Sequence, residues 1–314
     1  MNPSLKKWFV TSSLIISSLC SSTAVSAAGF TELVVFSDSL SDLGRAFTET
    51  GGTFPLYGSF TNGRYSNGPV WVEYLADSLG IGTNPNTNYA IGGALTGNIN
   101  AINFAPGFTS PPAPVFDGLT QQIASYTDYD PHALYIVWAG ANDYLFGGEM
   151  TPMNPISNLQ TNLQTLLTNG AKNILVGNLP NLGDTPGVSD SLQSAGLNLL
   201  TQGHNNALST TIDFLQTSFP HANIRLLDAN KQFQTITNDP SLFGLTNVAD
   251  SCLSGVVPCS NPDEYLFWDS LHPTTRGHQL ISNLALEALG IPEPSAVFGL
   301  IAIGISGIFL KQKV

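Results

Sequence analysis

Short apolar segments alternate with amphipathic segments through the middle of the chain, and this alternation limits the fold more than any other feature. The apolar segments have the length and composition of strands: 32–38, 87–95, 133–139, 173–180 and 223–229. The amphipathic segments carry apolar residues at helical spacing: 68–80, 155–171, 189–219 and 274–289. This alternation favours a parallel sheet covered by helices on both faces. Because we find no internal repeat and no linker, we expect one domain over residues 29–290.

The charge of the chain argues against binding to nucleic acid. Its 22 acidic residues outnumber its 10 basic residues, and the formal net charge is −12. A surface of this sign repels phosphate backbones. The sequence also lacks a Walker-type loop and a Rossmann glycine fingerprint. We therefore expect neither a nucleic-acid partner nor a cofactor.

Residues 1–28 have the organisation of an export signal. Two lysines, Lys6 and Lys7, precede a short apolar stretch, and the small-residue segment AVSAAG follows it. The apolar stretch is short and rich in serine, which is unlike a spanning helix. The pattern predicts a signal peptide that is cleaved after Ala27 or Ala28.

The C-terminal residues 291–314 have the organisation of a sorting signal. A Pro-Glu-Pro turn precedes the uncharged run 295–310 and a tail with two lysines. The run is marginal for a membrane span, which needs about 20 residues. The segment resembles the PEP-CTERM sorting signal of Gram-negative bacteria, with lysines where arginines are usual. The resemblance implies transient membrane retention through 295–310, cleavage by an exosortase-type enzyme, and release to or beyond the cell surface.

Two cysteines remain once the export signal and its Cys20 are removed. Cys252 and Cys259 lie close together in a protein that we expect to be exported, where disulfides persist. The segment CLSGVVPC has no His, Asp or Glu between them, so a metal would lack further ligands. We therefore expect a Cys252–Cys259 disulfide and no metal site.

Residues that carry chemistry follow the apolar segments where the strands are expected to end. Ser39 lies just beyond the first segment, Gly93 within the end of the second, and Asn142 beyond the third. Near the end of the chain, Asp269 and His272 are three residues apart. Ligands bind beyond the carboxyl ends of parallel strands, so we expect these residues to meet at one edge of the sheet.

This set of residues is what acyl transfer by a serine requires. A serine hydroxyl becomes a nucleophile when a histidine takes its proton, and an aspartate fixes the tautomer of that histidine. The tetrahedral intermediate needs N–H donors, each worth roughly 3–4 kcal/mol. The candidate donors are the backbone N–H groups of Ser39 and Gly93 and the side chain of Asn142.

Four sequence blocks are similar to the ordered motifs of the GDSL, or SGNH, esterase–lipase family: FSDSLSDLG, NYAIGGA, GAND and FWDSLHPT. The similarity runs from about Phe36 to His278. Two of the blocks, NYAIGGA and FWDSLHPT, resemble the subgroup that contains plant GDSL lipases and bacterial secreted phospholipases, esterases and acyltransferases. The resemblance implies a catalytic triad of Ser39, His272 and Asp269.

The resemblance further implies an oxyanion hole formed by Ser39, Gly93 and Asn142. It also implies a flavodoxin-like three-layer α/β/α sandwich with a mostly parallel five-stranded sheet. That fold agrees with the alternation of strands and helices described above.

One residue departs from the family pattern. Ser37 stands where the family usually has glycine. If a positive φ is required there, serine introduces strain of about 1–2 kcal/mol. If only a small residue is required, serine is tolerated. We favour the second interpretation because every other functional position is present.

Other histidines compete for the role of His272. Three of them are expected in helix or loop surface and one within the last helix: His132, His204, His221 and His278. None of the four has an aspartate three residues upstream at a turn, so His272 is favoured.

Two residues next to the candidate site residues and one aromatic segment have alternative interpretations. Gly92 is the alternative to Gly93 as an oxyanion donor, and Asp143 is expected to bond to nearby backbone. The segment 98–118 carries Phe104, Phe108 and Phe116. These rings either pack in the core or wall an acyl pocket, since aromatic loops beside active sites often shape apolar substrates.

The sequence therefore predicts a secreted serine hydrolase that cleaves carboxylic esters through an acyl-enzyme, with an ester or lipid as substrate. Water resolves the acyl-enzyme, or an alcohol does in an acyltransferase. The alternative is a surface or matrix protein that keeps the fold, lacks turnover and binds glycans or lipids, which Ser37 and the sorting segment motivate. The physiological substrate and the oligomeric state stay open.

Overall fold

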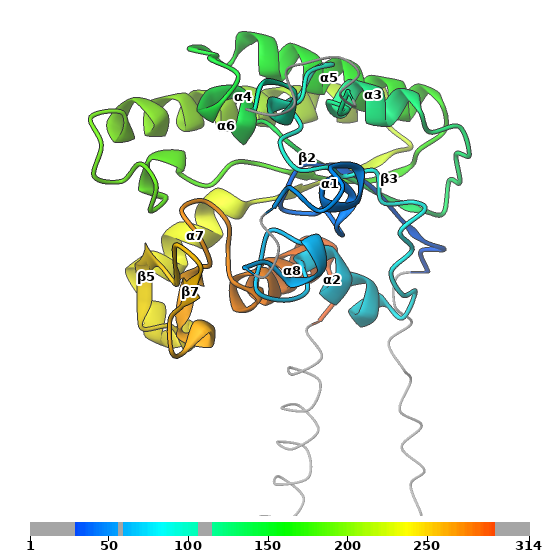
Figure 1. The fold of residues 1–314 in the computed structure, drawn as a ribbon. Helices are drawn as coiled ribbons and strands as arrows, with labels where there is room; N and C mark the ends of the chain where they lie inside the picture. Colours follow the sequence, from blue (N-terminus) through cyan, green and yellow to red (C-terminus); the bar gives the residue numbers. More distant parts are fainter. Residues whose placement is uncertain (1–28, 56–58, 106–114, 293–314) are drawn as a thin grey trace, which may run out of the picture.

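The computed structural model describes residues 29–55, 59–105 and 115–292 (Figure 1). The predicted export signal, nearly all of the sorting segment and Phe108 lie outside the described residues. Within the described part of the chain, no helix is both long enough and apolar enough to cross a membrane.

A parallel sheet of four strands, in the order β1-β2-β3-β4, forms the centre of the molecule. The strands are β1 (Leu33–Ser37), β2 (Leu134–Trp138), β3 (Asn173–Gly177) and β4 (Asn223–Leu227). The first three are almost completely buried. Strands covered on both faces need apolar residues on both sides, which is why their sequences are continuous apolar runs.

The predicted fifth strand at 87–95 is a correction. Its residues run along β1, where the N–H of Val35 donates to Thr87 O and the N–H of Tyr89 donates to Val35 O, but they form only an isolated bridge, Val35 to Asn88. The N–H of Ile91 also donates to Ser37 O at 3.3 Å, but the ladder bond between the N–H of Ser37 and Tyr89 O is missing because both groups have other partners. The N–H of Ser37 donates to the side chain of Gln122, and the carbonyl of Tyr89 accepts from Arg45.

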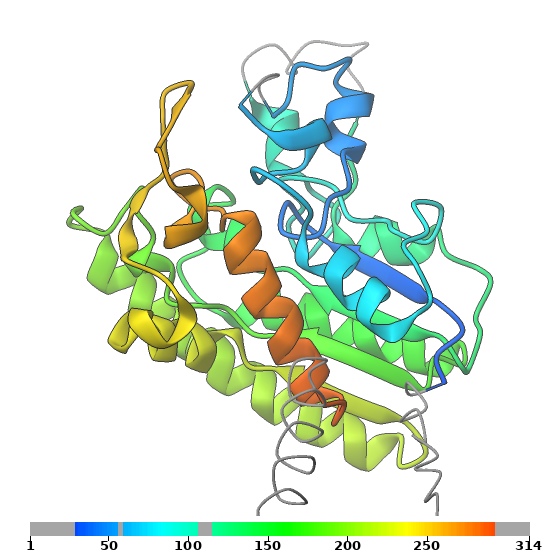
Figure 2. The ribbon, with the colours of Figure 1, turned by 90° about the horizontal axis from the view of Figure 1, so that it is seen from below.

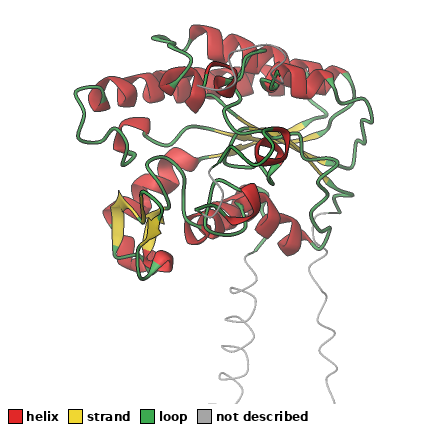
Figure 3. Cartoon of the chain, in the orientation of Figure 1, coloured by secondary structure: helices red, strands yellow, loops and turns green. Residues whose placement is uncertain are grey.

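Helices cover both faces of the sheet, so the fold is the predicted three-layer α/β/α sandwich (Figures 1 and 3). One face carries α3 (Leu119–Ala124), α5 (Met153–Thr168) and α6 (Ser194–Ser218). The other carries α2 (Trp71–Leu79), α7 (Ala229–Asn238) and α8 (Thr275–Ala288). Each face has its own apolar core, because side chains along a strand point alternately to the two sides.

Shorter elements surround the carboxyl edge of the sheet and the region before α8. The short helices are α1 (Arg45–Glu49), α4 (Ala141–Leu145), η1 (Thr61–Gly63), η2 (Ala101–Phe104), η3 (Leu182–Asp184), η4 (Pro240–Phe243) and η5 (Pro262–Glu264). The short strands are β5 (Asn247–Ser251), β6 (Leu253–Ser254), β7 (Val257–Pro258) and β8 (Tyr265–Phe267). Figure 2, seen from below, shows α8 crossing beneath the central sheet.

Two helix boundaries test the sequence patterns. Helix α2 ends at Gly80, which has a φ of 71°, so the predicted glycine stop is confirmed. Helix α6 begins at Ser194, not at residue 189, and continues to Ser218 without a break. Its two internal glycines, Gly196 and Gly203, each cost about 1 kcal/mol relative to alanine but do not interrupt the helix.

Candidate active site

The register of the sheet brings the predicted site residues to one edge. The last residue of β1, Ser37, pairs with the last residue of β2, Trp138. Ser39 lies two residues beyond β1, and Asn142 lies in α4, which begins three residues beyond β2. Because the strands are parallel, the two residues leave the sheet on the same side.

Ser37 fits its position without backbone strain. It is the last residue of β1 and is not among the residues with positive φ. Its hydroxyl donates to Trp138 O at 2.7 Å and accepts from the hydroxyl of Ser41 at 3.0 Å. The indole N–H of Trp71 in turn donates to the Ser41 hydroxyl at 3.0 Å. Serine therefore replaces the family's glycine with a buried polar contact between β1 and β2.

A continuous array of hydrogen bonds joins the three predicted triad residues. The Oγ of Ser39 lies 2.9 Å from Nε2 of His272, and Nδ1 of His272 lies 2.7 Å from Oδ2 of Asp269. The second oxygen of Asp269 accepts from the backbone N–H groups of Leu271 and His272, at 2.8 and 2.7 Å. These bonds fix the carboxylate, and the carboxylate fixes the imidazole ring.

The charges of this array favour proton transfer from serine to histidine. Burial lowers the pKa of His272, but the charge and hydrogen bond of Asp269, together with the charge of Asp38, raise it overall above its ordinary value. Burial raises the pKa of Asp269, but the charge of His272 and hydrogen bonds from His272 and Leu271 lower it overall. The carboxylate stays ionised and stabilises the imidazolium that forms when His272 takes a proton.

The structure distinguishes the two glycines that compete as oxyanion donors. The N–H of Gly92 donates to Oδ2 of Asp42 at 2.8 Å, so it is not available to a ligand. No described residue accepts from the N–H of Gly93 or of Ser39. Gly93 has a φ of 78°, and a Cβ there would lie 2.7 Å from Oδ1 of Asn100. Glycine is therefore required for this turn.

The third candidate donor, Asn142, is already oriented by its surroundings. Its side-chain amide donates to Ala94 O at 3.0 Å and makes a longer contact of 3.4 Å with Oδ2 of Asp38. Burial raises the pKa of Asp38 to about 6. The short bond fixes the amide plane, and the long contact leaves one N–H weakly bound and able to donate to an oxyanion.

Two buried carboxylates hold the loops of the site together. Asp42 accepts from the backbone N–H groups of residues 44, 45 and 46 and from that of Gly92, at 2.6 to 3.1 Å. Asp143 accepts from the backbone N–H and the hydroxyl of Thr96. Asp42 thus joins the serine loop to the glycine turn, and Asp143 joins the same turn to α4. Asp143 has the structural role expected of it, whereas the role of Asp42 was not predicted.

Gln122 is a further site residue that the sequence analysis did not identify. Its side chain is fully buried on α3. Its Oε1 accepts from the N–H of Ser37 at 2.9 Å, and its Nε2 donates to Ser37 O at 2.9 Å. The amide therefore binds the end of β1 as a neighbouring strand would, two residues before Ser39. No local pattern predicts this contact, because the partners are 85 residues apart.

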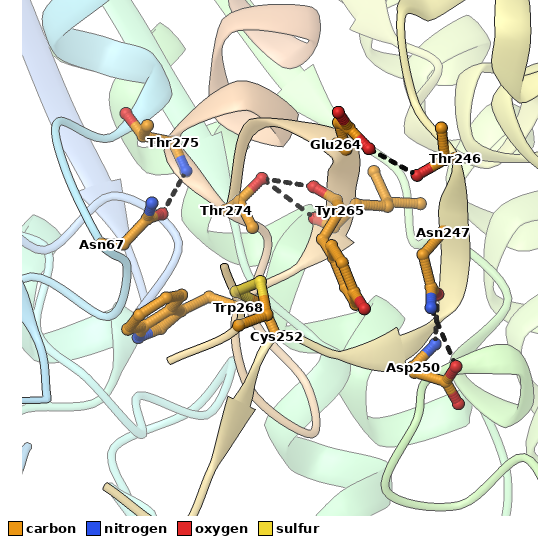
Figure 4. Close-up of a disulfide and its surroundings, with 12 residues drawn as sticks. Asn67, Thr246, Asn247, Asp250, Cys252, Glu264, Tyr265, Trp268, Thr274 and Thr275 are labelled. Carbon is orange, nitrogen blue, oxygen red and sulfur yellow. Dashed lines mark hydrogen bonds between the residues drawn. A yellow bond between two sulfur atoms is a disulfide. The ribbon is translucent and has the colours of Figure 1, made fainter. Parts of the chain in front are cut away.

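The loop that carries Asp269 and His272 is anchored to the disulfide hairpin. Cys252 and Cys259 are joined in a disulfide across β6 and β7. The N–H of Cys252 donates to Phe267 O, and the N–H of Leu253 donates to Trp268 O. Figure 4 shows Trp268 beside the disulfide, and its indole N–H donates to Ser59 O at 3.0 Å.

The start of α8 fixes the other side of this loop. The hydroxyl of Thr274 accepts from the N–H of Gly277, which makes Thr274 the N-cap of the helix, and it donates to Tyr265 O. The N–H of Thr275 donates to Asn67 Oδ1 at 2.7 Å (Figure 4). His272 thus lies between two rigid attachments, the hairpin and the helix cap.

An apolar hollow opens beside the array. It has a volume of about 700 Å³, and the residues that line it include Tyr65, Gly93, Ile102, Phe104 and His272. We name it the catalytic hollow. Two aromatic residues of the segment 98–118 are described. Phe104 lines the hollow, whereas Phe116 is fully buried in a small separate core with Ile91 and Ile102. The segment therefore contributes both to the wall of the hollow and to packing.

The competing histidines lie elsewhere, and one expectation about them is wrong. His204 is fully buried, not at the surface, and its Nδ1 lies 2.9 Å from the hydroxyl of Tyr144. Burial lowers the pKa of His204 to about 4 and that of His278 to about 3, so both are neutral near pH 7. His204 shares the buried face of α6 with Leu197 and Leu208. The helical spacing of His204 relative to these two leucines was the sequence signal that His204 is buried.

Histidine, cysteine and carboxylate side chains bind metal ions where several of them converge. Over residues 29–55, 59–105 and 115–292, no group of three or more His, Cys, Asp or Glu side chains is arranged to hold a metal ion.

A parallel α/β sandwich with a hydrogen-bonded Ser–His–Asp array at the carboxyl edge of its sheet has the arrangement of the serine hydrolases. Comparison with known families gives the narrower assignment. The pattern of the GDSL-like lipase/acylhydrolase family matches residues 33–285. The chain belongs to this family and is a carboxylic ester hydrolase.

Individual relatives are more distant. The chain is 28% identical to a phosphatidylcholine-sterol acyltransferase of Aeromonas hydrophila, over 94% of this chain and 97% of that protein. It is 28% identical to the secreted effector protein SseJ of Salmonella typhimurium, over 81% of this chain and 62% of that protein. A GDSL esterase/lipase of Arabidopsis thaliana is 25% identical, over 82% of this chain and 89% of that protein.

The fold is also similar to that of solved esterases. A carbohydrate acetylesterase from Sinorhizobium meliloti superposes with a TM-score of 0.49 at 14% identity, and covers 82% of this chain and 98% of that one. At this level of similarity, the comparison carries no information about substrate.

The contacts of Gln122 predict that it positions the nucleophile. Gln122→Leu leaves the N–H of Ser37 buried without a partner, so we expect the Ser39 loop to shift. A shift of about 1 Å lowers the rate of reaction up to a hundredfold. We expect kcat for p-nitrophenyl butyrate to fall about tenfold or more, with KM nearly unchanged.

The control for this experiment is Leu163→Ala, which shortens a buried apolar side chain on α5 that takes no part in the hydrogen bonds of Ser37. It destabilises the fold by about 2–5 kcal/mol. Both variants are assayed well below their melting temperatures. An unchanged kcat in Gln122→Leu, or an equal loss in both variants, would contradict the positioning role.

Proposed function

We propose that the protein cleaves carboxylic esters through a covalent acyl-enzyme on Ser39. The observation that carries this proposal is the continuous array from Ser39 Oγ to His272 Nε2, at 2.9 Å, and from His272 Nδ1 to Asp269 Oδ2, at 2.7 Å. Such an array supplies a nucleophile, a base that takes its proton, and a group that fixes the base.

The reaction begins when His272 Nε2 takes the proton of the Ser39 hydroxyl and Oγ attacks the ester carbonyl carbon. The carbonyl oxygen becomes an oxyanion and accepts from the N–H groups of Ser39 and Gly93 and from the amide of Asn142. The protonated His272 then gives its proton to the leaving alkoxide as the C–O bond breaks. The products of this half are a free alcohol and an acyl group on Ser39.

The acyl group leaves by the same steps with a second nucleophile. His272 takes a proton from water, the resulting hydroxide attacks the acyl carbon, and the acid is released as the proton returns to Ser39 Oγ. An alcohol in place of water gives a new ester. The similarity to a protein named as an acyltransferase supports this second outcome for the same acyl-enzyme.

The catalytic hollow supports an apolar acyl group as the preferred substrate portion. Phe54, Phe60, Ile102, Phe104 and Phe146 all contribute to its lining. Among the described residues of the lining, the ionisable side chains are Tyr65 and two members of the array, Asp269 and His272. Each methylene that an acyl chain buries there contributes about 0.8 kcal/mol, or up to about fourfold in kcat/KM.

The direct test is hydrolysis of p-nitrophenyl acetate, butyrate and hexanoate by the wild type and by Ser39→Ala. We expect kcat/KM of the wild type to rise with chain length. In Ser39→Ala we expect kcat to fall by at least about a thousandfold for every ester.

Ser218→Ala is the matched control, because it makes the same change at an exposed serine at the end of α6. It should retain the wild-type rates. Equal rates in the wild type and Ser39→Ala would overturn the acyl-enzyme and would favour the alternative of a binding protein without turnover.

We propose in addition that the protein is exported and processed at both ends. The export pattern of residues 1–28, the sorting pattern of residues 291–314 and the Cys252–Cys259 disulfide support this, since disulfides persist in oxidising compartments. One relative is named a secreted effector protein and another a thermolabile hemolysin.

Mass spectrometry of the mature protein tests the export proposal. We expect loss of the first 27 or 28 residues and of the tail beyond the Pro-Glu-Pro. Recovery of secreted protein with residues 295–314 intact would contradict processing at the sorting segment, and an intact N-terminus would contradict cleavage of the export signal.

A further inference from the structure

A second apolar hollow adjoins the catalytic hollow and has no part in the mechanism described above. Its volume is about 550 Å³, and it is lined by α4, by Met150 and Pro152, and by the loop and first turns that open α6. Leu197, Leu199 and Leu200 form much of its wall, and none of the described residues that line it is charged. We name it the α4–α6 hollow.

The two hollows meet at one residue. Leu145, the last residue of α4, lines both the catalytic hollow and the α4–α6 hollow. It also lines a small cavity of about 60 Å³ together with Asp38, Asn142 and His272. Leu145 follows the oxyanion candidate Asn142 by three residues, so the border between the hollows lies one helical turn from the reacting centre.

The rim around this border exposes large apolar side chains. Phe146 of the catalytic hollow is 58% exposed, and Met150 and Leu199 of the α4–α6 hollow are 78% and 70% exposed. Exposed apolar side chains that gather around a hollow mark a surface for an apolar ligand. The described residues that line the α4–α6 hollow are uncharged, which suits a hydrocarbon chain.

On the basis of the proposed esterase function, we propose that the α4–α6 hollow binds the second hydrocarbon chain of a two-chain ester. One chain occupies the catalytic hollow with its carbonyl at Ser39, and the other crosses Leu145 into the α4–α6 hollow. The substrate class is therefore an ester with two adjacent acyl chains, of which a diacylglycerol is the simplest example. Each methylene of the second chain that is buried raises kcat/KM up to about fourfold.

The test compares two esters that differ only in the second chain, 1,2-dihexanoylglycerol and 1-hexanoylglycerol, each below the concentration at which it aggregates. Release of hexanoate is titrated, and the ratio of the two kcat/KM values is the measured quantity. We expect the wild type to prefer the two-chain ester by at least about tenfold.

Gly196 provides a variant that fills the hollow. It lines the α4–α6 hollow, and a Cβ built there meets no atom within 4 Å. Gly196→Phe therefore places a ring in the hollow without strain, and it also raises helix propensity. We expect the ratio to fall to near one, while hydrolysis of 1-hexanoylglycerol stays at the wild-type rate. Gly196→Ala adds only a methyl group, so the ratio should fall much less.

A second variant keeps the proposal testable if Gly196→Phe does not fold. Leu199→Gln makes the exposed rim polar and should lower the ratio in the same selective way. Leu192→Gln is its matched control, because Leu192 is fully exposed and does not line the hollow. It should keep the wild-type ratio.

The outcomes separate this proposal from the proposed function. Hydrolysis of both esters with a ratio near one in the wild type, or a ratio that Gly196→Phe and Leu199→Gln leave unchanged, overturns the two-chain site and leaves the esterase intact. An equal loss for both esters in these variants also overturns it. Failure to hydrolyse either glycerol ester or p-nitrophenyl hexanoate overturns the esterase and the second-chain site together.

Discussion

A single buried carboxylate, that of Asp42, holds the geometry on which the site depends. It accepts from three successive N–H groups at the start of α1 and from the N–H of Gly92, which lies 50 residues further along the chain. Burial raises the pKa of Asp42, and these hydrogen bonds oppose that rise. The bond to Gly92 turns the next N–H, that of Gly93, away from protein acceptors. Asp42 therefore fixes the serine loop and the oxyanion turn relative to each other.

The rest of the site follows from the parallel sheet and from two attachments near the end of the chain. The sheet places Ser39 and α4 at one edge because β1 and β2 end at paired residues. His272 reaches Ser39 from a loop that lies between the disulfide hairpin and the N-cap of α8. Each functional group is thus held by backbone hydrogen bonds, which keeps the groups ordered before substrate binds.

Sequence patterns predicted the parts of this molecule that depend on local periodicity and on short motifs. The four strands of the sheet, the helical layers and the C-terminal stop of α2 follow from spacing and from glycine. The positions of Ser39, Asn142 and His272 follow from strand ends and from the motif blocks. Proximity at the sheet edge was expected because the ends of parallel strands converge there.

The features that the sequence did not predict depend on contacts between distant residues. The fifth strand is reduced to a bridge because Gln122 and Arg45 take the groups that would continue its ladder. Gly93 was predicted from the motif, but the contact of Gly92 with Asp42 that explains the choice joins distant residues. The burial of His204 depends on how α6 packs against Tyr144.

The most direct test of the claim that His272 activates Ser39 is the rate at which diethyl p-nitrophenyl phosphate labels Ser39, followed by mass spectrometry from pH 5 to 9. The account predicts a diethylphosphoryl group on Ser39 and a rate that rises with pH as His272 loses its proton, with a midpoint above the ordinary histidine value; in Asp269→Asn both the rate and the midpoint fall. A label on another residue, or a pH profile that Asp269→Asn leaves unchanged, would contradict it.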